Sequence, residues 1–177
     1  VKVYSRMIHA SGDPQYAEVI EVHPEAVAAG QKAIREGKNV YCDVEMVRTG
    51  INKKRLAQFD CQVECLIADE TVAAQAKAEG ITRSMAAMRT FGSKLDGAIV
   101  AIGNAPTALF EVIRLMQEEG VRPALIIGVP VGFVGAAESK DFLAEVSPVP
   151  YITVRGNKGG SPIAASALNA ILYQIAE

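Results

Sequence analysis

Three times in the second half of this chain, an apolar, strand-like stretch runs into a glycine-bearing loop and then into a helix-like stretch. The three joints span residues 97–107, 124–135 and 151–161. This order is typical of right-handed βαβ units, whose parallel strands bring their carboxyl ends to one edge of a sheet. The pattern predicts an α/β fold, a three-layer sandwich with a largely parallel sheet flanked by helices.

Local signals divide the rest of the chain. Apolar residues at helical spacing, prolines near helix starts and glycines after helix ends predict helices over residues 1–9, 25–36, 70–79, 82–90 and 106–119. A last helix is predicted with Ser161 as its N-cap and Pro162 in its first turn. Residues 39–42 and 61–67 have the pattern of short strands. No linker or low-complexity tract interrupts this order, so residues 1–177 are predicted to form one domain.

Composition narrows the classes of function. A formal charge of −2 argues against a nucleic-acid partner, which requires a strongly basic face. No apolar run approaches the roughly 20 residues that cross a bilayer, and no secretory signal is visible, so we expect no membrane partner. Cys42, Cys61 and Cys65 are expected to be reduced thiols in a cytoplasmic protein. Cys61 and Cys65 could form a metal site, but no other ligands accompany them; we favour strand packing and predict no metal site.

The glycine-bearing joints favour an anionic ligand. Helix N-termini offer free backbone N–H groups and the positive end of a dipole, and glycine lets a ligand approach the backbone closely. Arg83 and Ser84 lie in the first turn of a predicted helix, where a cation is unfavourable unless an anion is bound nearby. Arg155 and Lys158 flank Gly156 in the third joint. These residues predict a pocket for an anionic organic molecule at the sheet edge.

Several polar residues allow two interpretations each. Asn104, in the first joint, could cap the next helix or offer its amide to a ligand carboxylate. Lys140 could bind the ligand or be solvated at the surface. His23 precedes Pro24 and suits a helix entry, whereas His9 ends a predicted helix. A lone histidine is more often structural or solvated, but histidine is also the side chain best suited to proton transfer near neutral pH.

Familiar nucleotide and hydrolase signatures do not fit. The segment Gly156-Asn-Lys-Gly-Gly-Ser161 differs from a phosphate-binding P-loop because its lysine precedes the second glycine. No G-x-G-x-x-G follows a strand, and no G-x-S-x-G, H-x-x-x-H or C-x-x-C occurs. A nucleotide- or phosphate-binding protein of the doubly wound class is therefore a minor alternative.

Six blocks along nearly the whole chain carry a specific resemblance. They are Arg6-Met-Ile-His-Ala-Ser-Gly12, Asp43-Val-Glu-Met-Val47, Ile81-Thr-Arg-Ser84, Ala101-Ile-Gly-Asn-Ala-Pro-Thr-Ala-Leu109, Gly128-Val-Pro-Val-Gly-Phe-Val-Gly-Ala-Ala-Glu-Ser-Lys140 and Val154-Arg-Gly-Asn-Lys-Gly-Gly-Ser161. In this order they closely resemble the precorrin-8X methylmutase family, whose members in the anaerobic route are cobalt-precorrin-8 methylmutases.

The resemblance implies an isomerase of cobalamin biosynthesis. Members of the family move a methyl group from C-11 to C-12 of precorrin-8X or cobalt-precorrin-8, giving hydrogenobyrinate or cobyrinate. The step is a 1,5-sigmatropic shift within one molecule, so no cofactor, methyl donor or catalytic metal is implied. The substrate is a tetrapyrrole edged with carboxylates, which agrees with the cations of the predicted sheet edge.

The resemblance also assigns residues. The family's active-site histidine falls on His9, which we expect to donate a proton, and an arginine of its pocket falls on Arg83. From charge and position we add Ser84, Asn104, Lys140, Arg155 and Lys158 as substrate-binding candidates.

Two further expectations come from the family. Its members are homodimers with pockets near the subunit interface. They normally carry a helical segment before the histidine block, and this chain begins at Val1 without a methionine, so we expect further residues to precede it. The main alternative is a tetrapyrrole carrier on the same scaffold, which would need the cations and loops but not His9.

Overall fold

One mixed sheet forms the centre of residues 2–132 and 134–175, the part of the chain that the computed structural model describes. Its strands are β1 Ile20–Val22, β2 Val40–Cys42, β3 Val63–Cys65, β4 Ile99–Ile102, β5 Leu125–Gly128 and β6 Tyr151–Val154. Their order across the sheet is β1-β6-β5-β4-β2-β3. Only the pair of β1 with β6 is antiparallel among these neighbours. The predicted α/β sandwich with a largely parallel sheet is confirmed.

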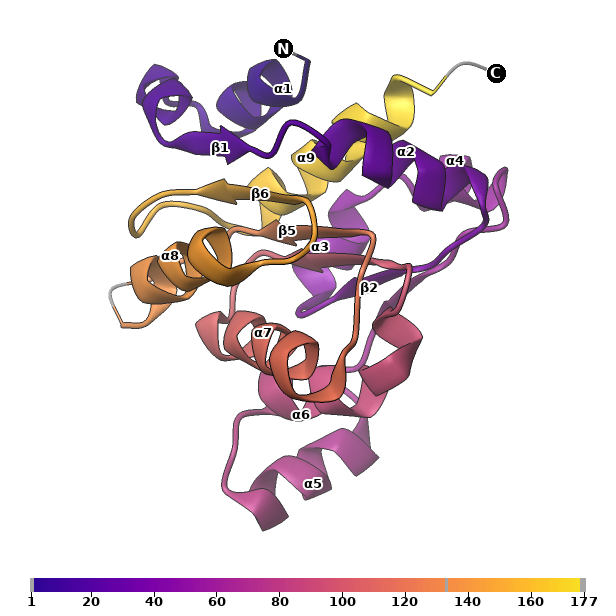
Figure 1. Ribbon diagram of the computed structural model, residues 1–177, viewed down its shortest axis with the longest axis vertical. Coiled ribbons are helices and arrows are strands. Elements are labelled where there is room, and N and C mark those ends of the chain that lie inside the picture. The colour runs from indigo at the N-terminus through magenta and orange to yellow at the C-terminus, as the bar shows by residue number, and fades with distance from the viewer. Residues whose placement is uncertain (1, 133, 176–177) are drawn as a thin grey trace.

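Helices cover both faces of the sheet (Figure 1). One layer holds α1 Lys2–Ser11, α2 Ala26–Arg35, α3 Glu45–Gly50 and α9 Ser161–Tyr173; the other holds α6 Arg83–Phe91, α7 Pro106–Glu119 and α8 Ala136–Val146. The remaining helices are α4 Lys53–Ala57, α5 Glu70–Glu79 and the 3-10 turns η1 Pro14–Glu18 and η2 Gly92–Leu95. Helix α5 packs on the outside of α6.

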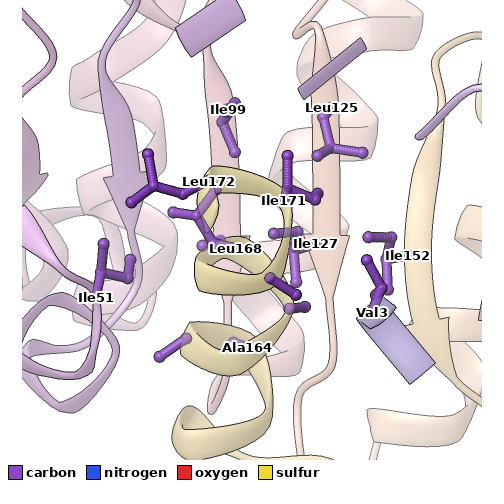
Figure 2. Packing of buried hydrophobic residues seen from close by; sticks show 14 of the residues in the cluster. Val3, Ile51, Ile99, Leu125, Ile127, Ile152, Ala164, Leu168, Ile171 and Leu172 are labelled. Carbon is purple, nitrogen blue, oxygen red and sulfur yellow. The ribbon is translucent and has the colours of Figure 1, made fainter. Parts of the chain in front are cut away.

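Helix α9 is the centre of the first layer. Leu168, Ile171 and Leu172 are fully buried and pack toward the strands that carry Ile99 and Leu125 (Figure 2). Val3 and Met7 of α1 belong to the same core. Burying each such side chain contributes about 1.5–3 kcal/mol to stability. Helix α1 is thereby held along α9.

A buried charge cluster joins two helices of the second layer. Glu111 of α7 is almost fully buried, and its carboxylate accepts a hydrogen bond of 2.6 Å from Arg114 and pairs at 3.1 Å with Nε of Arg89 in α6. A buried carboxylate needs such partners because its desolvation is costly. The pairing fixes α6 against α7, and so fixes the position of Arg83 at the start of α6.

The local predictions hold best at helix ends. Gly80 and Gly120 follow α5 and α7 in the left-handed conformation, with φ of 68° and 69°. The side chain of Thr82 accepts a hydrogen bond from the Met85 N–H, as an N-cap does. The predicted start of the first helix, Val1, lies outside the described residues.

Three boundaries were wrong. The predicted strand over 61–67 is strand only at Val63–Cys65; Cys61 is instead buried before it, and its thiol donates to the Ile34 carbonyl at 3.3 Å. Helix α9 has Gly160, not Ser161, at its N-cap, and α2 begins at Ala26. Strand β1, which the sequence did not predict, is too short to show alternation.

Candidate functional site

The three glycine-bearing joints meet at the carboxyl edge of the sheet. Val131 donates its N–H to the Asn104 carbonyl at 3.4 Å, and Gly160 donates to the Val129 carbonyl at 2.9 Å. We call residues 103–105, 129–132 and 155–160 the strand-end loops. They lie beside the point between β2 and β4 where the strand order reverses. In open α/β sheets, ligands bind in the crevice at such a reversal.

A carboxylate of the chain itself binds the backbone at this edge of the sheet. Asp43, directly after β2, is fully buried and accepts hydrogen bonds from the N–H groups of Gly103 (3.0 Å), Asn104 (3.0 Å) and Ala105 (2.7 Å). Burial raises the pKa of the Asp43 carboxyl, and the three amide hydrogen bonds oppose that rise. The N-terminus of α7 therefore already holds an anion. The prediction that this helix start offers free backbone N–H groups to a ligand was therefore wrong.

Asn104 is accordingly not a helix cap. The N-cap of α7 is Ala105, which makes no side-chain capping bond, because Asp43 supplies the acceptor from a distant part of the chain. The side chain of Asn104 is exposed. Its amide is accessible to a ligand at the sheet edge.

Lys140 is buried rather than solvated. None of its surface is exposed, and its Nζ donates to the Lys158 carbonyl at 2.6 Å. Burial lowers the pKa of Lys140 to about 8, and the neighbouring Asp141 carboxylate opposes that shift. The interpretation of Lys140 as a surface residue was wrong. Its ammonium holds the third strand-end loop and has no exposed surface with which to contact a ligand directly.

Arg155 and Lys158 also have partners within the chain. Arg155 pairs with Asp141 at 2.7 Å, and Lys158 pairs with Asp13 at 3.0 Å. Asp13 lies just beyond α1, so the second pair ties the end of α1 to the strand-end loops. The Tyr16 hydroxyl adds a longer contact of 3.4 Å to the Gly159 carbonyl.

Arg83 is an exposed cation at this edge of the sheet. The hydroxyl of Thr82 lies 2.8 Å from that of Thr107, so the N-termini of α6 and α7 are adjacent. Arg83 is exposed and makes no hydrogen bond or ion pair with the residues that the structure describes. Ser84, the next residue, is buried.

His9 lies in a groove between α1 and α9. The groove has a volume of about 650 Å³, and its lining includes Lys2, Arg6 and His9 from α1, Asn169 and Tyr173 from α9, and Gln174 directly after α9. We call it the α1–α9 groove. Its described lining residues include these basic side chains and no acidic one, so it favours an anion. The volume is in the range of pockets for small organic ligands.

Hydrogen bonds from the α3–α4 connection fix one wall of the groove. Asn169 accepts the Asn52 N–H at 2.9 Å and donates to the Gly50 carbonyl at 3.0 Å. The amide of Asn52 donates to the Tyr173 hydroxyl at 3.0 Å. These bonds hold the exposed face of α9 in place.

Sequence reasoning missed the basic groove residues other than His9, although a signal exists. Lys2, Arg6 and His9 are spaced i, i+4, i+7, which places them on one face of α1. Asn169 and Tyr173 have the same spacing on α9, an otherwise apolar helix. Two facing polar stripes on adjacent helices would have predicted the groove.

The fold and the site define a class: an α/β protein of doubly wound topology with a cationic groove in one helical layer, suited to an organic anion. No group of three or more histidine, cysteine or acidic residues in the described ranges could hold a metal ion. Within those ranges, every helix is too short or too polar to cross a bilayer.

Comparisons with known proteins identify the family. The sequence model of the precorrin-8X methylmutase family matches residues 1–174. The chain is 48% identical to the cobalt-precorrin-8 methylmutase of Priestia megaterium, covering 96% of this chain and 75% of the relative. It is 44% identical to the precorrin-8X methylmutase of Pseudomonas aeruginosa, covering 96% and 82%. The chain therefore belongs to the precorrin-8X methylmutase family, and it is an isomerase of cobalamin biosynthesis.

A solved structure agrees with this assignment. The precorrin-8X methyl mutase from Thermus thermophilus superposes with a TM-score of 0.90 at 43% identity, over 97% of this chain and 82% of the other. The resemblance inferred from the six sequence blocks is confirmed.

Proposed function

We propose that this protein moves a methyl group from C-11 to C-12 of precorrin-8X or cobalt-precorrin-8, with His9 as the proton donor. The observation that carries the proposal is the position of His9 in the α1–α9 groove, beside two further basic side chains and no acidic one among the described lining residues. A tetrapyrrole edged with carboxylates is the kind of anion that such a groove favours.

The substrate also contacts the carboxyl edge of the sheet in this proposal. His9 is in the last turn of α1, four residues before Asp13, and Asp13 is paired with Lys158 of the strand-end loops. The end of α1, where His9 lies, is therefore tied to the strand-end loops through Asp13. Arg83 and Asn104, both exposed at that edge, bind substrate carboxylates. Ser84, Lys140, Arg155 and Lys158, which are buried or internally paired, hold these groups in position.

The chemistry needs little from the protein besides orientation and polarisation. The bond from the methyl group to C-11 breaks as the bond to C-12 forms, so the atoms balance within one molecule. A proton or hydrogen bond from His9 to the macrocycle stabilises charge that develops during the shift. General-acid help of this kind is worth about 10²–10⁴-fold in rate, and restraint of the flexible macrocycle supplies more.

The test is a visible-absorption assay with precorrin-8X, because the shift changes the conjugation of the ring. We expect progressive conversion to hydrogenobyrinate by the protein and a loss of rate of at least about 10²-fold in His9→Ala. His23→Ala is the matched control, since the His23 imidazole accepts a local hydrogen bond from the Glu25 N–H and does not line the α1–α9 groove. Near-normal turnover by His9→Ala would refute the proton-donor role.

Two other outcomes are informative. A spectral change that stops at one equivalent of protein would mean binding without turnover and would favour the carrier function. If precorrin-8X gives no change, the same assay is run with cobalt-precorrin-8. Failure with both would overturn the proposed reaction.

We also propose a cytoplasmic homodimer with pockets near the subunit interface, as the family resemblance implies. One chain has a mass of 18.8 kDa. Light scattering after size-exclusion chromatography should give twice that mass for the dimer; the mass of one chain would contradict it.

A further inference from the structure

Two cysteines, Cys42 and Cys65, lie directly opposite one another in the sheet. Strands β2 and β3 are parallel neighbours, and their register pairs Cys42 with Cys65. Paired residues of neighbouring strands point to the same face of a sheet, and the strands are about 4.7–4.9 Å apart. Cys42 belongs to the core that contains α9, and Cys65 packs against the same core. The two thiols are therefore adjacent on one face of the sheet.

The spacing of this pair is compatible with a disulfide bond. The Cα atoms of bonded cysteines are usually about 4.4–6.8 Å apart, a range that includes the distance between neighbouring strands. All three cysteines of the chain are free thiols in this structure. Cys61 differs from the pair, because it lies outside β3 and its thiol donates to the Ile34 carbonyl at 3.3 Å. The register therefore singles out Cys42 and Cys65.

The two thiols differ in their access to solvent. Cys42 is fully buried, whereas Cys65 is partly buried and ends β3, which lies at one edge of the sheet. A small oxidant can therefore reach Cys65 while the core stays folded. Once the sulfur of Cys65 is oxidised, the adjacent Cys42 can attack it without any exposure of its own.

The surroundings of the pair make its reaction slow at neutral pH. Burial raises the pKa of the Cys65 thiol to about 11. The carboxylates of Glu45 and Asp43 add to the rise, and Arg48 and a backbone N–H oppose it. The pKa of the Cys42 thiol is raised as well, again chiefly by burial. Because the thiolate is the nucleophile, these cysteines suit a response to sustained oxidation rather than a step in each turnover.

The position of Cys42 connects the pair with the candidate site. Asp43, the next residue, binds three backbone amides of the first strand-end loop, residues 103–105. A disulfide bond brings its two Cβ atoms to about 3.8 Å, which is closer than the distance between neighbouring strands. The bond must therefore draw the ends of β2 and β3 together, and Asp43 moves with the end of β2.

We propose that Cys42 and Cys65 are a modification site: a peroxide converts them to a disulfide, which displaces Asp43 and the first strand-end loop and lowers binding and turnover. The Cys65 thiolate attacks the O–O bond of hydrogen peroxide and forms a sulfenic acid and, with the thiol proton, water. The Cys42 thiol then attacks that sulfur, and the sulfenic oxygen leaves as a second water. Two thiols are oxidised and one peroxide is reduced. An external dithiol reverses the bond by exchange.

The first test identifies the bond directly. The protein is treated with hydrogen peroxide, remaining thiols are alkylated, and a digest is analysed by mass spectrometry. The digest uses trypsin and a protease that cuts after glutamate, because cleavage after Glu64 separates Cys61 from Cys65. We expect a cross-linked pair of peptides that contain Cys42 and Cys65, and its disappearance after treatment with dithiothreitol.

An exposed methionine shows that the oxidant was sufficient. Met46 is 66% exposed, and peroxide converts methionine to its sulfoxide. Conversion of Met46 while Cys42 and Cys65 stay reduced would overturn the proposal, as would oxidation of Cys65 without a cross-link. The rate of cross-linking should also rise about tenfold per pH unit from pH 7 to pH 9, because the thiolate reacts. A rate independent of pH would contradict attack by these thiols.

The second test measures the effect on the site. Hydrogenobyrinate, the product of the proposed reaction, is titrated into reduced and cross-linked protein and followed by visible absorption. We expect the cross-link to raise the Kd about tenfold and to slow turnover about 10–100-fold, as small displacements in a site do. Dithiothreitol, which leaves methionine sulfoxide unchanged, should restore both. Unchanged binding and turnover in fully cross-linked protein would refute the effect on the site.

Cys65→Ala is the diagnostic variant. It removes the accessible thiol, so its Kd and turnover should match those of the reduced wild type before and after peroxide. Cys61→Ala is the matched control, because it removes a cysteine outside the pair and should respond to peroxide as the wild type does. Equal losses in Cys65→Ala and the wild type would assign the effect to another side chain and overturn the proposal.

The cross-link and the proposed function fail separately. The peptide map reports the bond whether or not the protein converts a precorrin. A protein that forms the bond and converts neither precorrin would refute the reaction, and the Kd would still measure the effect of the bond. Normal turnover without any cross-link would refute the modification site alone.

Discussion

The strand-end loops and the α1–α9 groove are both rich in cations, but those cations differ in what they already bind. At the loops, Lys140 of α8 donates to the Lys158 carbonyl, and Lys158 pairs with Asp13. In the groove, Arg6 stacks on a tyrosine ring, and the described lining residues supply no carboxylate. The loops therefore hold the fold together, whereas the groove presents positive charge to an external anion.

This difference teaches how a charged motif should be interpreted. A buried charge must find a partner because its desolvation is costly, and a chain can supply that partner itself. Asp43 does so for the N-terminus of α7, where an anionic ligand was expected. A glycine, a helix start and a nearby cation occur together both where the chain supplies its own anion and where an external anion binds. What distinguishes a ligand site is a polar group that the described chain leaves without a partner.

The largest loss of stability should come from removing the Asp43 carboxylate, which binds the backbone amides of the first strand-end loop. Asp43→Ala leaves three buried or partly buried N–H groups without an acceptor, and each costs about 1–3 kcal/mol. We expect the free energy of unfolding in urea to fall by about 3 kcal/mol or more. Asp43→Asn keeps one acceptor oxygen and should lose less. A loss below about 1 kcal/mol in Asp43→Ala would contradict a structural role for this carboxylate.

The close packing of the loops gives the next prediction. A Cβ atom on Gly159 would meet the backbone carbonyl oxygens of Val129 and Pro130, neither of which can move as a flexible side chain does. Gly159→Ala should therefore lower the free energy of unfolding by about 1–3 kcal/mol. A variant as stable as the wild type would show that the third strand-end loop is not fixed against the second.

Arg83 and Arg155 allow a comparison of an open and an internally paired cation at the same edge of the sheet. Arg83 has no partner in the described part of the chain, whereas Arg155 pairs with Asp141 at 2.7 Å. Arg83→Gln should raise KM about tenfold or more, because a charge-assisted bond to the substrate is lost. Arg155→Gln should change KM less, because exposed ion pairs contribute little. Equal effects of the two substitutions would remove the distinction between open and internally paired cations.

The smallest expected effect is a dependence of the protein's stability on pH, caused by Lys140. Burial lowers its pKa in the folded protein to about 8, from the ordinary lysine value of 10.5. Between those pH values the unfolded chain binds more protons than the folded one, so stability should rise with pH. From pH 7.5 to pH 9.5, the free energy of unfolding of the wild type should rise relative to that of Lys140→Met by on the order of 1 kcal/mol. Parallel curves for the two proteins would contradict a buried, titrating ammonium.

The elements of the fold were predictable where their signals are local. The inward residues of α7, Leu109, Val112, Ile113 and Met116, follow helical spacing and are all buried. Gly80 and Gly120 end their helices because glycine adopts the left-handed conformation without strain. Strand β1 was missed because three residues cannot display alternation, and it pairs with a strand more than 100 residues away in the chain.

The candidate site was only partly predictable. The role of His9 came from the family resemblance, whereas Arg83 was indicated also by its place in the first turn of a helix; both side chains are exposed. The burial of Lys140 was not predicted, because its acceptor is the carbonyl of Lys158, 18 residues further on. Lys2 and Arg6 were not predicted as groove residues, although their spacing with His9 puts them on one helix face.

The sequence by itself determined the α/β class, most helix ends and the family, because these depend on apolar periodicity, on glycine and proline, and on blocks of residues in a fixed order. Only the tertiary structure decided which charges are open to a ligand. Asp43 and the amides that it binds are about 60 residues apart in the chain. Whether a charge is satisfied depends on the distance to its partner in space, and the fold alone sets that distance.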